Sequence, residues 1–155
     1  MKIISGGQTG VDRAALDVAL ELKLPCGGWC PKGRLAEDGK IASQYPLIET
    51  PTSDYSERTE WNVRDSDGTL ILTYGTPIGG TGLTVEIAQI LKKPLLILDL
   101  NNPLPKEEVM DWIQSNQIQT LNVAGPRESF RTEGIYKVAK EYLKSFANLL
   151  QRNRR

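Results

Sequence analysis

The 155-residue sequence contains no histidine. This absence excludes the catalytic triads and dyads that use an imidazole base, and it removes a ligand on which most protein zinc sites depend. Cysteine is scarce as well, because Cys26 and Cys30 are the two that the chain has, and zinc would need two further soft ligands. We interpret both as reduced structural thiols in a reducing cytoplasm, with a thiolate role for Cys30 as the alternative. No metal ligands are predicted.

The sequence also lacks an excess of charge and any long apolar run. Nineteen basic residues balance nineteen acidic ones, so nothing predicts a nucleic-acid or membrane-surface partner. The apolar runs are far too short to span a membrane, and the chain begins directly with an expected strand rather than with a signal peptide. The basic tail 152–155 is expected to fray. These features predict a cytoplasmic location.

What the sequence does contain is an alternation of short apolar runs with segments of helical periodicity. Strands are expected at 2–4, 47–50, 69–72, 95–98 and 118–124, and helices at 10–23, 55–66, 83–93, 105–116 and 132–150. The continuous apolar run at 95–98 is typical of a central parallel strand. The pattern predicts one α/β domain over 1–155, with a Rossmann-like open parallel sheet of about five strands and helices on both faces.

Two glycine-rich turns join a predicted strand to a predicted helix. They are Ser5–Gly10, which follows residues 2–4, and Gly79–Gly82, which follows the strand at 69–72. Glycine allows the backbone to turn sharply and to approach a ligand, and the start of a helix presents free N–H groups. Two such turns predict a phosphate site, although tight turns without a ligand are the alternative. Neither turn is the dinucleotide fingerprint or a Walker motif.

Ligands of open α/β sheets bind beyond the carboxyl ends of the strands. Three polar, glycine-bearing strand exits should meet there, namely 5–10, 73–84 and 122–129. The long segment 26–46, rich in glycine, proline and charge, is expected to contribute to function as well.

Three side chains on the predicted helices are candidates for ligand contacts. Glu86 lies one turn into the helix that follows Gly82, where a carboxylate could approach a bound ligand. Arg58 and Asn62 are four residues apart and share a helix face, so that a guanidinium fork and an amide could act together. In each case a solvated helix surface is the alternative.

Two of these segments resemble the SLOG superfamily of nucleotide-binding proteins, which includes the Lonely Guy phosphoribohydrolases. Residues 78–86 are similar to the Pro-Gly-Gly-x-Gly-Thr-x-x-Glu motif of these enzymes, with Ile78 and Leu83 in place of its proline and threonine. Residues 57–59 resemble their Glu-Arg-Lys segment, although Thr59 replaces the lysine. By this resemblance Arg58 and Glu86 match the catalytic pair.

A closer resemblance, over nearly the whole chain, is to the molybdenum cofactor carrier family within the same superfamily. It is carried by five segments, 5–13, 28–39, 58–67, 79–84 and 122–129. The family implies a homo-oligomer that binds molybdopterin, a phosphorylated pterin, together with its molybdenum. It also implies molybdoenzymes as recipients.

The resemblance leads us to expect a carrier that binds a small phosphorylated ligand. Its phosphate would contact the two glycine turns, Arg58 and Asn62 would hold the pterin or the oxo-metal end, and Lys32 and Arg34 would cover the site. The residues expected at the phosphate are Gly6, Gly7, Gln8, Thr9, Gly10, Gly79, Gly80, Thr81, Gly82 and Thr84.

Two alternatives remain at this point. The first is an enzyme that hydrolyses the N-glycosidic bond of a nucleoside monophosphate, in which Glu86 would polarise the ribose or activate water and Arg58 would stabilise the departing base or the phosphate. The second is a sensor that binds a nucleotide derivative and signals through oligomer contacts.

Overall fold

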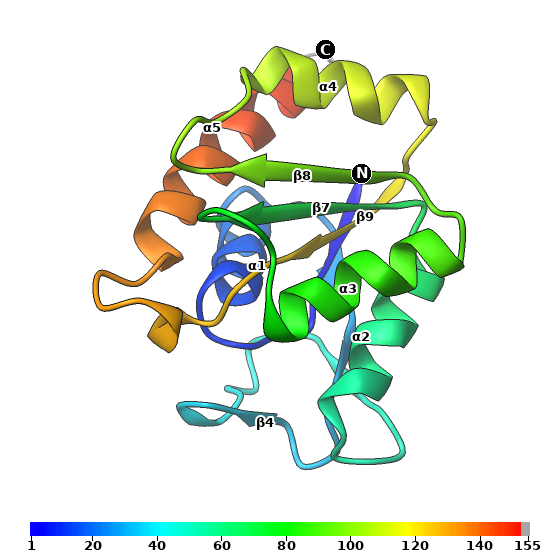
Figure 1. Cartoon of the computed structure of the whole chain (residues 1–155), viewed down its shortest axis with the longest axis vertical. Coiled ribbons are helices and arrows are strands. Elements are labelled where there is room, and N and C mark those ends of the chain that lie inside the picture. The colour runs from blue at the N-terminus through cyan, green and yellow to red at the C-terminus, as the bar shows by residue number, and fades with distance from the viewer. Residues whose placement is uncertain (153–155) are drawn as a thin grey trace.

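A five-stranded parallel sheet forms the centre of the computed structural model, which describes residues 1–152 (Figure 1). The tail beyond Arg152, expected to be basic and frayed, lies outside the described residues. The strand order is β2-β1-β9-β7-β8. The strands are β1 (Lys2–Ile4), β2 (Cys26–Gly27), β7 (Gly68–Thr73), β8 (Leu95–Asp99) and β9 (Thr120–Ala124). The predicted Rossmann-like α/β class is confirmed.

Helices cover both faces of the sheet. On one face α1 (Val11–Glu21) packs against α5 (Tyr136–Arg152), and α5 packs against α4 (Lys106–Ser115). On the other face α2 (Tyr55–Arg64) packs against α3 (Gly79–Ile90), as Figure 1 shows. None of the helices within residues 1–152 combines the length and the apolar character needed to cross a membrane.

The main hydrophobic core lies between the sheet and the α1–α4–α5 face. Leu70 and Leu72 of β7, Leu98 of β8 and Leu121 of β9 are fully buried there, against Phe146 of α5. Alternate residues of each strand point to opposite faces, so the residues between them face α2 and α3. The sheet is therefore a rigid platform whose strand ends can hold a site.

A second, smaller core lies beneath the long segment that follows α1. This segment contains β3 (Trp29–Cys30), which pairs in parallel with β6 (Ile48–Glu49), and the hairpin of β4 (Leu35–Ala36) and β5 (Gly39–Lys40). Its core comprises Leu16, Cys30, Ala36, Ile41, Tyr45 and Leu47. Both cysteines are free thiols, and burial raises their pKa values, which agrees with the structural role inferred for them.

Two expectations about the elements are corrected. Strand β8 is an edge strand rather than a central one, since it pairs only with β7 among the described residues, and Ile97 is 40% exposed. Its apolar run arises because one face packs on the main core and the other lies beside α3. The second correction is that α3 begins at Gly79, four residues earlier than expected, so the second glycine turn is the first turn of the helix itself.

Candidate functional site

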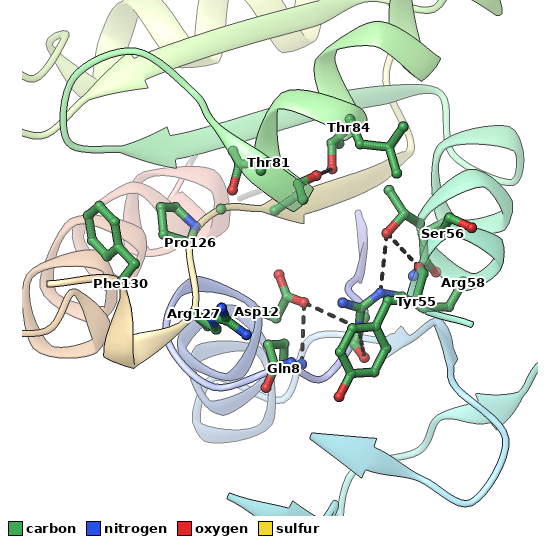
Figure 2. Close-up of a pocket in the computed structure, with 18 of the residues that line it drawn as sticks. Gln8, Asp12, Tyr55, Ser56, Arg58, Thr81, Thr84, Pro126, Arg127 and Phe130 are labelled. Carbon is green, nitrogen blue, oxygen red and sulfur yellow. Dashed lines mark hydrogen bonds and ion pairs between the residues drawn. The ribbon is translucent and has the colours of Figure 1, made fainter. Parts of the chain in front are cut away.

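A pocket of about 450 Å³ opens at the carboxyl ends of β1, β9 and β7 (Figure 2). The chain leaves β1 toward β2 on one side and β7 toward β8 on the other, so the pocket lies at the switch in strand order where α/β sheets bind ligands. All three predicted strand exits contribute to it, together with α2. The lining residues include Gly6, Gln8, Asp12, Tyr55, Arg58, Asn62, Ile78, Gly79, Gly80, Thr81, Thr84, Asn122, Arg127, Ser129 and Phe130.

The start of α3 presents unused hydrogen-bond donors to this pocket. Ile78 precedes the helix in an extended conformation and provides no side-chain cap. Within residues 1–152 the backbone N–H groups of Gly79, Gly80 and Thr81 have no protein acceptor, as expected for the first turn of a helix. A Cβ atom built on Gly79 or Gly80 would meet nothing within 4 Å, so the glycines leave open space beside these donors. This arrangement is suited to an anion.

Two threonines of the same helix line the pocket but differ in their free groups. Thr84 donates its hydroxyl to the Gly80 carbonyl at 3.1 Å. The hydroxyl of Thr81 has no hydrogen-bond partner in the described part of the chain, although the residue is 6% exposed. Thr81 can therefore add a side-chain donor to the backbone donors of α3 (Figure 2).

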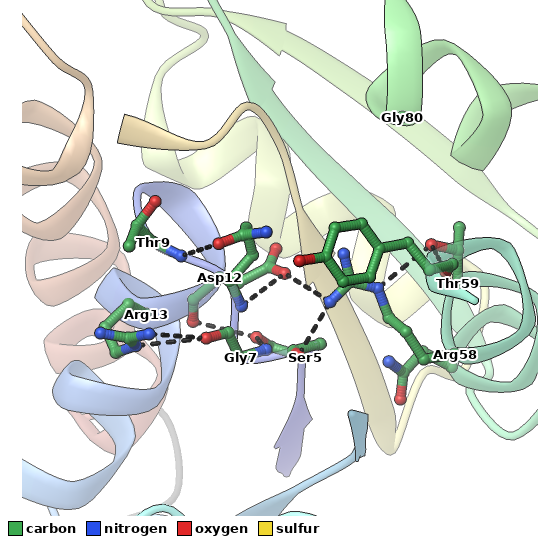
Figure 3. Close-up of polar contacts among 12 residues, drawn as sticks. Ser5, Gly7, Thr9, Asp12, Arg13, Arg58, Thr59 and Gly80 are labelled. Atoms are coloured by element: carbon green, nitrogen blue, oxygen red, sulfur yellow. Dashed lines mark hydrogen bonds and ion pairs between the residues drawn. The ribbon is translucent and has the colours of Figure 1, made fainter. Parts of the chain in front are cut away.

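Three N–H groups of the first glycine turn already have acceptors in or next to the turn. The Gly7 N–H donates to Ser5 Oγ at 3.3 Å, the Gln8 N–H to Asp12 Oδ2 at 3.3 Å, and the Thr9 N–H to Gln8 Oε1 at 3.0 Å. Figure 3 shows this network at the start of α1. The two turns look alike in sequence, but the N–H groups of Gly79, Gly80 and Thr81 have no acceptor in residues 1–152, whereas those of Gly7, Gln8 and Thr9 do.

Close packing explains why the first turn is rich in glycine. Gly10 has a φ of 80°, and a Cβ there would lie 2.4 Å from the Pro126 carbonyl oxygen. At Gly7, where φ is 79°, a Cβ would lie 2.5 Å from the Leu47 side chain. Gly7, Thr9 and Gly10 do not line the pocket, whereas Gly6 and Gln8 do.

A buried ion pair lies at the floor of the pocket. Arg58 donates from Nη1 to the Gly6 carbonyl at 2.9 Å and lies 3.9 Å from Asp12 Oδ2, and the two charged side chains are 11% and 9% exposed. Burial raises the pKa of the Asp12 carboxyl to about 6, against the opposing attraction of Arg58. A Cβ on Gly6 would lie 2.6 Å from Arg58 Nη1, so glycine is needed here for the guanidinium.

Asp12 was not among the predicted site residues. It occupies the second position of α1, directly after the first glycine turn, and helix position alone does not distinguish a capping carboxylate from a pocket-lining one. The signal that could have indicated it is the pairing with Arg58, which requires the fold because the two residues are far apart in sequence.

Asn62 lines the pocket, but both ends of its amide hold the backbone of β3. Its Oδ1 accepts from the Trp29 N–H at 2.8 Å, and its Nδ2 donates to the Trp29 carbonyl at 3.0 Å. The residue is 3% exposed. These contacts give Asn62 a structural role, in which it fixes α2 against the long segment.

Besides Gly7, Thr9 and Gly10, four further predicted site residues lie outside the pocket lining. Glu86 is exposed on α3, Lys32 is exposed on the long segment, and Gly82 does not line the cavity. The guanidinium N–H groups of Arg34 donate hydrogen bonds to four carbonyls of the same segment, those of Ile41, Ala42, Tyr45 and Leu47. Arg34 thus holds the long segment together.

The third strand exit forms a rim that sequence reasoning identified only as a range. It contributes Arg127, Ser129 and Phe130, the last two within a 3-10 turn, η1 (Glu128–Phe130). Ser129 donates its hydroxyl to Glu37 at 2.5 Å, and Arg127 lies 3.7 Å from the same carboxylate. The β4–β5 hairpin is thereby fastened to the rim.

No group of three or more Cys, Asp or Glu side chains that could hold a metal ion occurs in the part of the chain that the structure describes. The polar groups of the pocket include N–H and hydroxyl donors at α3, the Asp12–Arg58 pair and the Arg127 guanidinium at the rim. Tyr55, whose ring lies 5.1 Å from the Arg58 guanidinium, and Phe130 add aromatic surface.

Comparison with known proteins agrees with this architecture. A crystal structure of a protein from Syntrophus aciditrophicus SB, described as a "putative molybdenum carrier protein", superposes with a TM-score of 0.88 at 51% sequence identity. The match covers 94% of this chain and 93% of the other. The search of curated proteins returned no significant match. The model of the circularly permuted YpsA SLOG family matches residues 3–147, and the chain belongs to this family.

Proposed function

We propose that this protein is a cytoplasmic carrier of a phosphorylated heterocycle, the molybdenum cofactor. The observation that carries the proposal is the start of α3. There the Thr81 hydroxyl and three backbone N–H groups that have no acceptor among residues 1–152 line a cavity of about 450 Å³. Cavities of this size hold small organic ligands. The 51% identical relative described as a molybdenum carrier supports the identity of the ligand.

In this proposal the terminal phosphate contacts α3, and not the first glycine turn. The helix start has partial positive charge, and Gly79 and Gly80 allow the phosphate oxygens to approach the backbone closely. The pterin would then extend toward Arg58 and Tyr55, with the first turn forming the floor beneath it. Release to a molybdoenzyme requires only that these noncovalent contacts be broken.

Glu86 favours the carrier over the hydrolase. Hydrolysis by the pair expected from the enzyme family would need Glu86 and Arg58 at the same ligand. Arg58 lines the pocket, whereas Glu86 is exposed outside its lining. Release of free base from nucleoside monophosphates, at a rate that depends on Glu86, would contradict the carrier assignment.

We also propose that the protein is a homo-oligomer, associated through α3 and the edge strand β8. Ile90 is 75% exposed on α3, and Ile97 of β8 faces the same side of the sheet because Leu96 and Leu98 point into the main core. Exposed isoleucines beside an unpaired strand edge are a surface that a second copy could cover.

The direct test is chemical analysis of the native protein. Protein purified under anaerobic conditions should release a fluorescent pterin derivative on acid oxidation, and protein produced in cells that cannot make the pterin should release none. The proposal is contradicted if the native protein yields no pterin and the pterin-free protein does not bind added cofactor.

A further inference from the structure

One half of the pocket has a polarity opposite to that expected for a phosphate site. Asp12, buried to 6% exposure, places a carboxylate in the lining, and a carboxylate repels phosphate but accepts hydrogen bonds strongly. Its Oδ2 accepts from the Gln8 N–H and lies nearest Arg58. Figure 2 shows its other oxygen, without a dashed line, turned toward the cavity between Gln8 and the start of α3.

We infer that Asp12 selects the heterocycle, by accepting hydrogen bonds from a ring that carries a 2-amino-4-oxo pyrimidine edge. This inference rests on the proposed function, since it concerns the same pocket. Such an edge, present in pterins and in guanine, carries a ring N–H beside an exocyclic amino group. One of these donors would bond the Asp12 oxygen that has no partner, and the other would bond Oδ2 through the lone pair that the Gln8 N–H leaves free. The adjacent 4-oxo group is an acceptor, and Arg58 lies next to Asp12 as a donor.

The Asp12 carboxyl remains ionised above neutral pH. Burial raises its pKa to about 6, and the charges of Arg58 and Arg13 with the backbone N–H groups of Gln8 and Gly6 limit the rise. Tyr55 lies beside Arg58 and is 40% exposed, so its ring is available to stack on the heterocycle. The phosphate would remain on the opposite wall, at α3.

The test compares three nucleoside monophosphates that differ at this edge. Guanosine monophosphate offers both donors, inosine monophosphate lacks the amino group, and adenosine monophosphate presents a ring acceptor in place of the N–H. Isothermal titration at pH 7.5 should show the wild-type protein binding the guanine nucleotide about tenfold or more tightly than the other two. This comparison needs no variant to fold.

A variant then assigns the preference to the residue. Asp12→Asn retains the shape of the side chain but replaces one acceptor oxygen by a donor, and it should lose the preference for the guanine nucleotide. Asp38→Asn is the matched control, because Asp38 also pairs with an arginine, Arg13 at 2.9 Å, but does not line the pocket. This control should keep the preference.

Two failures can be told apart with inorganic phosphate as a separate probe. Equal affinity for the three nucleotides, or a guanine preference that persists in Asp12→Asn, would overturn the assignment of Asp12 even if phosphate binds. Absence of binding for phosphate and for every nucleotide would overturn the anion site at α3, and with it the inference that depends on it.

Discussion

At the scale of single residues, the pocket depends on one buried charge. Asp12 is held by the first glycine turn on one side and by Arg58 on the other, and Arg58 fits because residue 6 is glycine. Burying a carboxylate costs free energy that the Arg58 guanidinium, 3.9 Å away, offsets only in part. The protein therefore carries a destabilising group at its candidate site, which is the usual compromise between stability and function.

The cost of Asp12 should be visible as a pH dependence of stability. The folded-state pKa of about 6 exceeds the ordinary value of 3.8, so the folded protein binds the proton more tightly than the unfolded chain does. Stability from this group is fully present below pH 3.8 and is lost as the pH rises to about 6. Between pH 4 and 7 the wild type should therefore lose about 2 kcal/mol of its free energy of unfolding relative to Asp12→Asn.

Urea unfolding of the two proteins at several pH values measures this difference, and the other titrating groups, being common to both, largely cancel. Curves that run parallel from pH 4 to 7 would show that Asp12 is not the buried, perturbed carboxyl described above.

Asn62 provides a second residue-scale prediction, on stability. Asn62→Ala leaves the backbone N–H and carbonyl of Trp29 without their partners, and it should reduce the free energy of unfolding by about 2–3 kcal/mol. Asn116→Ala is the control, because the Asn116 amide donates to the Trp112 carbonyl at an exposed helix end, and its loss should cost about 0.5 kcal/mol or less. Equal losses in chemical denaturation would argue against the structural role of Asn62.

At the scale of elements, the first turn of α3 sets the chemistry of the site. A helix start without a side-chain cap leaves its donors available, and Gly79 and Gly80 keep the space beside them open. The first glycine turn, which precedes α1, has a similar sequence, but Ser5, Asp12 and Gln8 accept hydrogen bonds from three of its N–H groups. Donor availability, and not glycine content, separates the two.

Two glycine-to-alanine substitutions test the role of α3. Gly80→Ala places a methyl group in the pocket and should weaken binding of the phosphorylated ligand about tenfold. Gly82→Ala lies in the same helix but outside the pocket lining, so it should leave affinity near the wild-type value. Both variants should be at least as thermally stable as the wild type, because alanine is more favourable than glycine in a helix by up to about 1 kcal/mol. The assignment fails if both variants bind equally well.

The same elements show what the sequence can and cannot predict. Periodicity located the helices, because the apolar faces of α1, α4 and α5 follow the helical repeat. It located four strands of the main sheet but missed the two-residue β2, and the expected strand at 47–50 pairs with β3 outside that sheet. The low helix propensity of glycine predicts a start for α3 after Gly82, whereas Gly79–Gly82 form the first turn of the helix. The apolar run of β8 predicts a central strand, but such a run does not reveal whether a second strand or solvent lies at its free edge.

The candidate site was predictable only in outline for the same kind of reason. The meeting of three strand exits follows from element order, and Arg58 lines the pocket that they form. The sequence does not show which N–H groups of the turns already have acceptors, because this depends on the folded backbone. Nor does it show that Asp12 faces Arg58, because the two residues are far apart in sequence. Arg34 shows the limit most clearly. The sequence predicts that this residue covers the site, whereas the four carbonyl partners of its guanidinium give it a structural role.

At the scale of the whole molecule, the sheet separates a well-covered face from a partly covered one. The α1–α4–α5 face buries the main core, whereas the α3 side leaves Ile90 and Ile97 exposed near the edge strand. Association through this side would also place neighbouring copies next to the helix that forms one wall of the pocket.

Light scattering coupled to size-exclusion chromatography should therefore give a mass of two or more chains of 17.2 kDa each. Ile90→Glu should shift the protein toward the monomer without changing its circular dichroism. Leu35→Glu is the control, since Leu35 is 43% exposed on the hairpin, away from α3 and β8, and it should leave the mass unchanged. A monomeric wild-type protein would contradict the proposed association.

In the proposed function, the second glycine turn, at the start of α3, holds the phosphate of the ligand. A crystal structure of the protein with a bound phosphorylated pterin tests it most directly. We expect the phosphate oxygens within hydrogen-bond distance of the N–H groups of Gly79, Gly80 and Thr81, with the first turn unchanged. A phosphate bound instead to an opened Ser5–Gly10 turn, with α3 making no contact to it, would contradict the account.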